Sequence, residues 1–284
     1  MEDPIQIVLC GKQLTISPNG NKTLWESMAT DRWELDSLEL IAEQLNENDV
    51  FVDMGAWAGP ISLFAAHFAA KVYAIEPDPI VFEQLLRNIK LNPSLINKVI
   101  PFEVAISDKN EHKKLFARKD YGQSSTSLLS RTFDQNSTHE CESLTFSKYI
   151  QHKGIKKVNF IKMDIEGSEF FVLPEIIPTL ERLNYPSLLV SFHMEYLVEY
   201  FLKKWGISPF LSRIIMKLHR RWKLYPFKKL LQNYSNRLEP LIGCYPYCYA
   251  PNGSSINFRE LLNDPFQLGL TPCFFSKQQW IKHD

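Results

Sequence analysis

The stretch Asp49-Val50-Phe51-Val52-Asp53-Met54-Gly55-Ala56-Trp57-Ala58-Gly59-Pro60 decides the fold of this chain. Its apolar residues predict a buried strand that ends at the acid Asp53 and breaks into a turn with two glycines. The apolar run 61–70 that follows predicts a helix. In an α/β sheet this order builds a ligand pocket, because the ligand lies at the carboxyl end of the strand and the helix N-terminus offers free amides.

The same alternation of strand and helix continues along the chain. Right-handed crossovers between such strands give a parallel sheet with helices on its faces. Residues 109–143 are polar and predict hairpin strands with a long loop. Strands are expected at 71–76, 99–106, 157–164 and 187–192, with closing strands at 244–250 and 268–275, and helices at 30–45, 80–91, 145–152 and after residue 169.

Length and composition favour one sizeable core, or one core with an appended subdomain. The chain has 284 residues, is 45% hydrophobic and carries no net charge. The bulk charge therefore makes no case for nucleic acid or membrane. No signal peptide and no apolar run long enough to span a bilayer is evident, and the five scattered cysteines favour a reducing compartment, so we expect a cytoplasmic protein.

Polar residues stand where four of the predicted strands end: Asp53, Glu76, Asp164 and His193. Acids after strands are often only helix caps, but all four at this spacing, together with the glycine turn, favour a ligand site. Gly55 and Gly59 let the backbone come close to that ligand, because they lack a Cβ. Glu76 follows Asp53 by 23 residues, near the roughly 20-residue offset of an acid that binds ribose hydroxyls.

The turn favours S-adenosylmethionine over a dinucleotide. The dinucleotide pattern G-x-G-x-x-G is missing, and the turn reads D-x-G-x-x-x-G with an acid in front. A pyrophosphate needs no acid there, whereas the ammonium and sulfonium groups of S-adenosylmethionine suit one. A reductase on a dinucleotide-binding sheet is a distant alternative.

Three segments, 52–60, 73–78 and 160–169, resemble the motifs of FkbM-type S-adenosylmethionine-dependent methyltransferases. The run Lys162 to Glu169 is the most specific part. The resemblance implies an α/β class I methyltransferase (Rossmann-like) fold, with a seven-stranded, mostly parallel sheet whose last strand is antiparallel. We therefore expect a β and helical extension at 1–48, and a methyltransferase domain at 49–284 with a basic helical insertion or lid at 195–240.

The resemblance also implies roles for particular residues. Methyl transfer in the family goes most often to a hydroxyl of a sugar or natural product. Glu76 would hold the ribose, and Trp57 would either wall the cofactor pocket or simply pack. The cofactor-binding set expected from these motifs and from the glycine turn is Asp53, Gly55, Trp57, Gly59, Glu76 and Asp108, with Asp53 and Gly55 at the methionine end and Asp108 near the adenine.

Methyl transfer to a hydroxyl also needs a group that takes up the hydroxyl proton. His193 is the first candidate, since its unshifted pKa lies near neutrality. Asp164 and Glu166, which the resemblance places where donor and acceptor meet, compete as base or as hydroxyl ligands. A metal bound by these three residues is an alternative, and we expect none. A structural histidine is the ordinary interpretation of a lone His at a strand end.

Residues 200–238 contain ten Lys and Arg but no Asp or Glu. An apolar stripe runs through this segment at Leu211, Ile214, Ile215, Leu218 and Trp222. It predicts a core-packed helix with a solvated basic face, a lid over an acidic substrate, or a membrane-surface helix; nucleic acid is the least favoured partner. A non-catalytic binding protein that holds a partner through this segment is the alternative function. The acceptor and the oligomeric state are not predicted.

Overall fold

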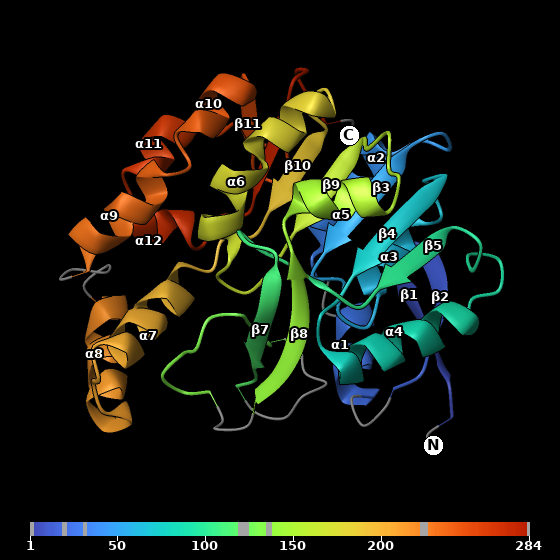
Figure 1. Cartoon of the computed structure of the whole chain (residues 1–284). Coiled ribbons are helices and arrows are strands. Elements are labelled where there is room, and N and C mark those ends of the chain that lie inside the picture. Colours follow the sequence, from blue (N-terminus) through green and yellow to red (C-terminus); the bar gives the residue numbers. More distant parts are fainter. Residues whose placement is uncertain are drawn as a thin grey trace.

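A seven-stranded sheet runs through the centre of the molecule (Figure 1). The computed structural model describes residues 3–18, 22–30, 33–118, 125–134, 138–221 and 227–282. The strand order is β11-β12-β10-β9-β3-β4-β5. The strands are β3 (Val50–Met54), β4 (Lys71–Ile75), β5 (Val99–Phe102), β9 (Phe160–Met163), β10 (Ser187–Val190), β11 (Tyr247–Tyr249) and β12 (Cys273–Ser276).

Strand direction confirms the predicted fold class. β10, β9, β3, β4 and β5 pair in parallel, whereas β12, the last strand, pairs antiparallel with both β10 and β11. Because parallel strands need crossovers, all their carboxyl ends meet at one edge of the sheet. The polar residues predicted at strand ends are brought to that edge.

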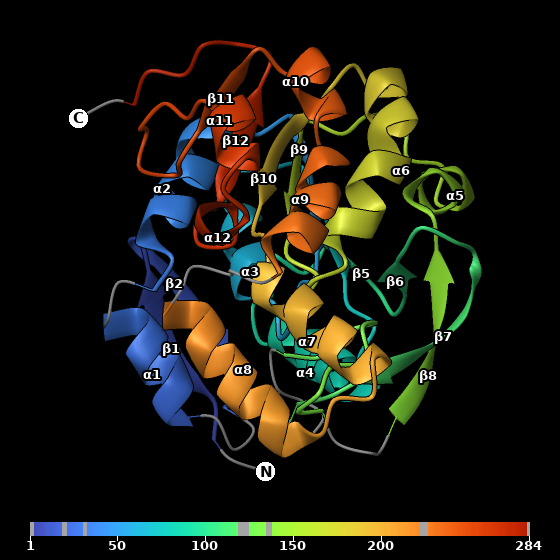
Figure 2. The same ribbon diagram turned by 90° about the vertical axis from the view of Figure 1, so that its left-hand side faces the viewer.

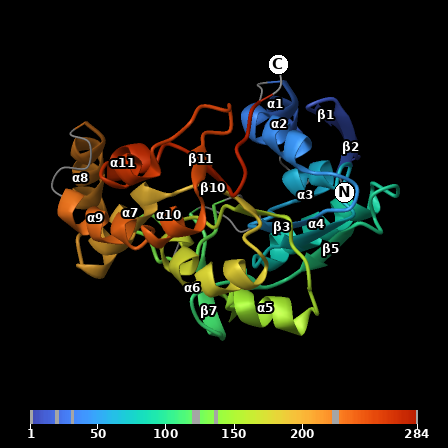
Figure 3. The ribbon, with the colours of Figure 1, turned by 90° about the horizontal axis from the view of Figure 1, so that it is seen from above.

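Helices cover both faces of the sheet (Figure 3). Side chains of β3 alternate, so that Phe51 belongs to one hydrophobic cluster while Val52 and Met54 belong to the other. The first cluster includes residues of α2 (Leu35–Gln44), α3 (Pro60–Ala65) and α4 (Pro79–Lys90), and the second includes residues of α5 (Phe146–His152) and α6 (Glu169–Arg182). Thr145 and Asp78 cap α5 and α4, as their side chains accept hydrogen bonds from backbone amides of the first turn.

Two predicted elements divide in the structure. The predicted strand 99–106 ends in the main sheet at Phe102, and β6 (Ala105–Ile106) pairs instead with β8 (Thr138–Leu144), which forms the predicted hairpin with β7 (Glu111–Phe116). The predicted helix 30–45 is also wrong in its bounds. The chain forms α1 (Lys22–Thr30) and then α2, whose N-cap residue Glu34 has a left-handed φ of 45° that no continuous helix allows.

The N-terminal extension packs on the sheet. β1 (Ile5–Leu9) and β2 (Lys12–Ile16) form an antiparallel hairpin, and its inward side chains join α1 and α3 in one hydrophobic cluster. Asn88 of α4 accepts a hydrogen bond from the backbone amide of Ser17, and Asn92, just after the end of α4, accepts one from the amide of Thr15. These bonds tie the hairpin to the second crossover helix.

The chain after β10 is mainly helical, and the described part of residues 195–240 consists of helices separated by short turns at 205–208 and 237–239. The elements are α7 (Met194–Lys204), α8 (Pro209–Arg221), α9 (Lys228–Asn236), α10 (Pro240–Cys244), α11 (Phe258–Leu262) and α12 (Pro265–Leu268). Trp222 of the predicted apolar stripe lies outside the described residues. Among the helices of the described ranges, none has the length and apolar character needed to cross a bilayer.

Candidate active site

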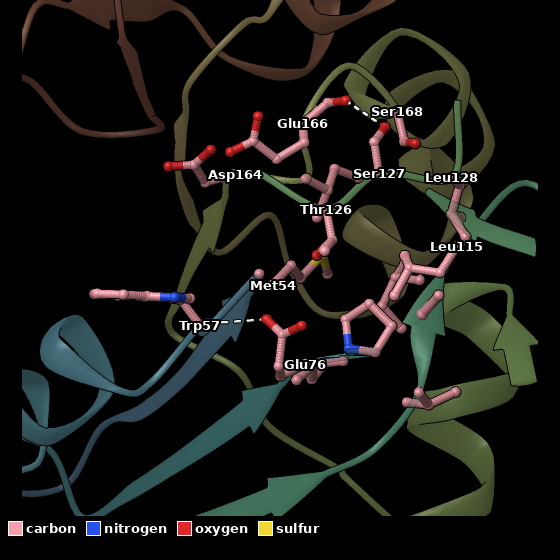
Figure 4. A pocket seen from close by; sticks show the side chains of 17 residues that line it. Met54, Trp57, Glu76, Leu115, Thr126, Ser127, Leu128, Asp164, Glu166 and Ser168 are labelled. Atoms are coloured by element: carbon pink, nitrogen blue, oxygen red, sulfur yellow. Dashed lines mark hydrogen bonds between the residues drawn. The ribbon is translucent and has the colours of Figure 1, made fainter. Parts of the chain in front are cut away.

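An open cavity lies at the carboxyl ends of β3, β4 and β9 (Figure 4). The turn after β3, the end of β4 and the segment after β9 form one side of its lining. The other side comes from residues 104–106 at the start of the three-stranded sheet β6-β8-β7, from Leu115 of β7 and from residues 126–128. The lining residues are Met54, Gly55, Trp57, Ile75, Glu76, Pro77, Val104, Ala105, Ile106, Leu115, Thr126, Ser127, Leu128, Asp164, Ile165, Glu166 and Ser168.

Gly55 allows the ends of β3 and β9 to come together. Its φ is 84°, and a Cβ at this position would collide with the carbonyl oxygen of Asp164. Glycine is therefore required on two counts, the left-handed backbone and the absence of a side chain. This close approach keeps the Asp164 segment against the first strand and fixes the mouth of the cavity.

Glu76 faces the cavity from the end of β4 (Figure 4). Its Oε2 accepts a hydrogen bond of 2.9 Å from the Trp57 amide, and its Oε1 accepts one of 2.8 Å from the Asp78 amide. Burial raises the pKa of this carboxyl to about 8. Because a carboxylate offers about four lone-pair sites, Glu76 keeps accepting capacity for hydroxyls of a ligand.

Trp57 fits both of its predicted interpretations. The residue lines the cavity, and its indole ring also stacks on Trp25 of α1 with 5.0 Å between ring centroids. Its φ of 47° is left-handed, which places its amide on Glu76. The N-terminal extension thus supports the glycine turn through one aromatic contact.

Three other predicted cofactor residues lie outside the cavity lining. Asp53 is fully buried against α3, where its Oδ2 accepts a 2.6 Å hydrogen bond from the Ser62 hydroxyl, and burial raises its pKa to about 6. Gly59 begins α3 with a φ of 93°. Asp108 forms a 2.9 Å ion pair with Lys113. Ala105 and its neighbours occupy the wall where Asp108 was expected.

The predicted catalytic residues come together as a cluster. The His193 Nε2 lies 3.5 Å from Asp164 Oδ1 and 3.8 Å from Glu166 Oε2. On the other side of the ring, Nδ1 lies 3.0 Å from Oε1 of Glu169. Glu169 is fully buried and also accepts hydrogen bonds from the amides of residues 165 and 167. Glu169 thereby fixes the orientation of the imidazole.

Charges in this cluster shift three pKa values. Burial acts to lower the pKa of His193, but the Glu169 carboxylate and its hydrogen bond, with Asp164 and Glu166, outweigh it and raise the pKa to about 10. Burial alone would raise the pKa of Asp164, yet the Lys162 ammonium holds it below its ordinary value. Burial raises the pKa of Glu166 to about 7. At neutral pH the imidazole is therefore protonated among carboxylates.

Several residues of this region were missed by sequence reasoning. Burial raises the pKa of Glu34, a carboxyl close enough to Lys162 and Asp164 to interact with their charges. The fully buried guanidinium of Arg131 lies 4.4 Å from the centre of the Tyr196 ring, which stacks on His193. Glu34 belongs to the extension and Arg131 to the polar segment 109–143, so no strand-end pattern marks them.

Asp164, Glu166 and His193 could also hold a metal ion, because their potential ligand atoms all lie within 4.8 Å of one another. Two cationic groups already face these carboxylates, however. The Lys162 ammonium lies 3.2 Å from Asp164 Oδ2, and the raised pKa of His193 keeps its imidazole protonated at neutral pH. The expectation that the site works without a metal stays a prediction.

Comparison with known proteins identifies a family match. The model of the methyltransferase FkbM domain matches residues 48–222. Hexuronic acid methyltransferase AglP of Haloferax volcanii is 25% identical over 170 residues, 57% of this chain and 63% of that protein. tRNA (guanine(37)-N(1))-methyltransferase Trm5b of Methanocaldococcus jannaschii is 45% identical over 71 residues, 25% of this chain and 20% of that protein. The matched segments thus span less than two thirds of either relative.

Among solved structures, similarity is modest. The methyltransferase FkbM from Methylobacillus flagellatus KT has a TM-score of 0.36 at 15% identity, with 64% of this chain and 55% of that chain covered. M. jannaschii TYW2, solved in complex with AdoMet, has a TM-score of 0.35 at 18% identity, with 68% of this chain and 64% of that chain covered.

Proposed function

Because this chain belongs to the FkbM methyltransferase family, we propose that it transfers a methyl group from S-adenosylmethionine to an oxygen atom of a sugar or another small acceptor. One observation carries the proposal. One cavity at the edge of the sheet is lined by the Glu76 carboxyl and by Asp164 and Glu166, and these last two contact His193. Similarity to a hexuronic acid methyltransferase supports a sugar acceptor.

The residues of the cavity fit S-adenosylmethionine. Glu76 retains lone pairs for the two ribose hydroxyls. Val104, Ile106 and Leu115 offer an apolar wall that suits a flat adenine ring, and Gly55 leaves the backbone open for the methionine end. Bound there, S-adenosylmethionine would supply an electrophilic methyl group next to the Asp164 segment.

The protein's part in the reaction is to hold the acceptor and take up its proton. The Glu169 carboxylate holds the imidazole of His193 by Nδ1 and leaves Nε2 directed at Asp164 and Glu166. In its neutral form this Nε2 can accept the proton of an attacking hydroxyl. Asp164 and Glu166 orient that hydroxyl, and Glu166, whose pKa is about 7, is the second candidate for the base.

Isothermal titration calorimetry with S-adenosylmethionine and with NAD tests the cofactor. Binding of the former alone is expected, and binding of NAD alone would contradict the proposal. Mass spectrometry of uronic and neutral sugars incubated with the protein and S-adenosylmethionine then tests turnover by the gain of one methyl group. Cofactor binding with no methylated product from any acceptor, including a cell extract, would favour the non-catalytic binding protein.

A further inference from the structure

Helix α8 turns one face toward the protein. Ser212 and Met216 are buried, and Ile215 packs partly against the large hydrophobic cluster. These residues recur three and four positions apart, so they lie on one side of the helix. Figures 1 and 2 show α8 at the periphery, with α7 beside it. Packing against the rest of the protein thus covers only this side of α8.

The opposite side of α8 carries large apolar side chains in solvent. We call Phe210, Leu211, Ile214 and Leu218 the outer stripe; their exposures are 76%, 44%, 43% and 40%. At 100° per residue they share one arc of the helix, turned away from Ser212 and Met216. An apolar row of this kind on the surface marks an interaction site rather than packing within the chain.

Basic residues flank the outer stripe. Lys217 and Arg221 are exposed beside it, with Arg213 one turn earlier. Over residues 200–238 the chain has ten Lys and Arg and no acid, although its net charge is zero. The segment of the sequence that carries the outer stripe is thus positively charged.

We propose that α8 docks the protein on the surface of an anionic lipid bilayer. The outer stripe would enter the headgroup region, and the flanking Lys and Arg would meet lipid phosphates, as in other amphipathic basic helices that lie in the interface. The exposed stripe contradicts a helix whose apolar side is all packed in the core. No residue of α8 lines the described cavity, which argues against a lid.

A membrane fits better than a nucleic acid. Proteins bind single strands through charge together with aromatic side chains that stack on bases. Three of the four residues in the outer stripe are aliphatic and offer no such surface. Aliphatic side chains between basic residues gain free energy by leaving water for a lipid interface.

Flotation of the full-length protein with phospholipid vesicles tests the proposal without any activity assay. Vesicles of phosphatidylcholine with phosphatidylglycerol should carry the wild type upward at 0.1 M NaCl, and those of phosphatidylcholine alone should carry far less. Phe210→Ser/Ile214→Ser/Leu218→Ser should reduce the bound fraction at least about tenfold, since it removes the apolar anchor. Lys217→Ala/Arg221→Ala should reduce affinity roughly 25-fold, at about fivefold for each charge.

Matched variants elsewhere on the surface provide controls. Val8→Ser/Leu270→Ser/Ile281→Ser removes side chains that are 53%, 60% and 70% exposed, and Lys109→Ala/Lys156→Ala removes two exposed charges. Both should float like the wild type. Absence of flotation by the wild type, or equal losses in control and α8 variants, overturns the proposal. So does binding of single-stranded RNA without flotation, which would identify nucleic acid as the partner.

Discussion

At the residue scale, the protonation state of the site is determined by the charges of three carboxyls around one imidazole. Asp164, Glu166 and Glu169 surround His193. Their negative charge keeps its imidazole protonated to about pH 10. A base must lose that proton before it can accept another, so the activity of His193 depends on pH and on its neighbours.

The first prediction concerns the pH dependence of turnover. If His193 is the base, kcat rises with pH, and the apparent pKa of this rise lies well above 6.5, because the neutral imidazole forms only when the proton has left. Glu169→Gln removes the charge that raises the pKa of His193 most and keeps a hydrogen-bond acceptor. The rise should then move to lower pH.

The control for this experiment is Glu142→Gln, an exposed acid on β8, which should leave the profile unchanged. His193→Ala should lose most turnover at every pH while it keeps cofactor affinity. A rise at the same pH in wild type and Glu169→Gln would exclude His193 as the base and favour Glu166.

The second prediction concerns Glu76 and cofactor affinity. Burial raises the pKa of Glu76 to about 8, and ribose hydroxyls donate to the ionised form. Affinity for S-adenosylmethionine should therefore increase as pH rises from 6 to 9 and level off above the pKa. Titration calorimetry of Glu76→Gln should show weaker binding of S-adenosylmethionine, and its affinity should increase less between pH 6 and 9 than that of the wild type. An identical pH dependence in variant and wild type would refute the ribose role.

At the element scale, the glycine turn determines how closely β3 and β9 approach. Gly55 follows β3, and the space that a Cβ would need is taken by the carbonyl of Asp164 at the end of β9. The turn is thus part of the packing between two strands as well as a wall of the cavity. A change there acts on stability and on the site together.

The third prediction compares two glycines of similar backbone conformation. Gly55→Ala should destabilise the protein by clearly more than the roughly 1–2 kcal/mol that a left-handed alanine costs, because the ends of β3 and β9 must also separate. Gly206, with a φ of 72° and open space around it, provides the control. Gly206→Ala should lower the free energy of unfolding only by the cost of a left-handed alanine. Chemical denaturation measures both. Equal losses would show that the strand contact does not matter.

At the scale of the whole molecule, the N-terminal extension and the sheet share one core. Trp25 of α1 is 1% exposed and stacks on Trp57 at the cavity. Glu34, which begins α2, interacts with the charges of Lys162 and Asp164. Residues far apart in sequence thus support the same site, so the extension contributes to more than stability.

The fourth prediction follows from the contact between the two tryptophans. Trp25→Ala should lower the free energy of unfolding by about 3–5 kcal/mol, the usual cost of removing a buried aromatic side chain. It should also weaken cofactor binding, because Trp57 loses the ring that holds it. Trp205→Ala, at a side chain 53% exposed, is the control for loss of an indole. Unchanged calorimetric affinity in Trp25→Ala would show that the extension does not support the site.

The alternation of strands and helices in the main sheet, the glycine turn and the polar strand ends could be predicted from the sequence. These features depend on local periodicity and on the rule that parallel strands place their carboxyl ends at one edge. For that reason His193 and Asp164 could be grouped from the sequence alone, and the family motifs added Glu166 to them. The parallel sheet with its antiparallel last strand followed from the family motifs.

Only the tertiary structure decided which side chains meet across elements. It placed Asp53 against Ser62 and Asp108 on Lys113, and it brought Glu34, Arg131 and Tyr196 to the cluster around Asp164 and His193. It also turned the apolar stripe of α8 to solvent, where the pattern alone allowed a buried face. Periodicity shows that a helix has an apolar side, but the packing of neighbouring elements determines whether that side is covered.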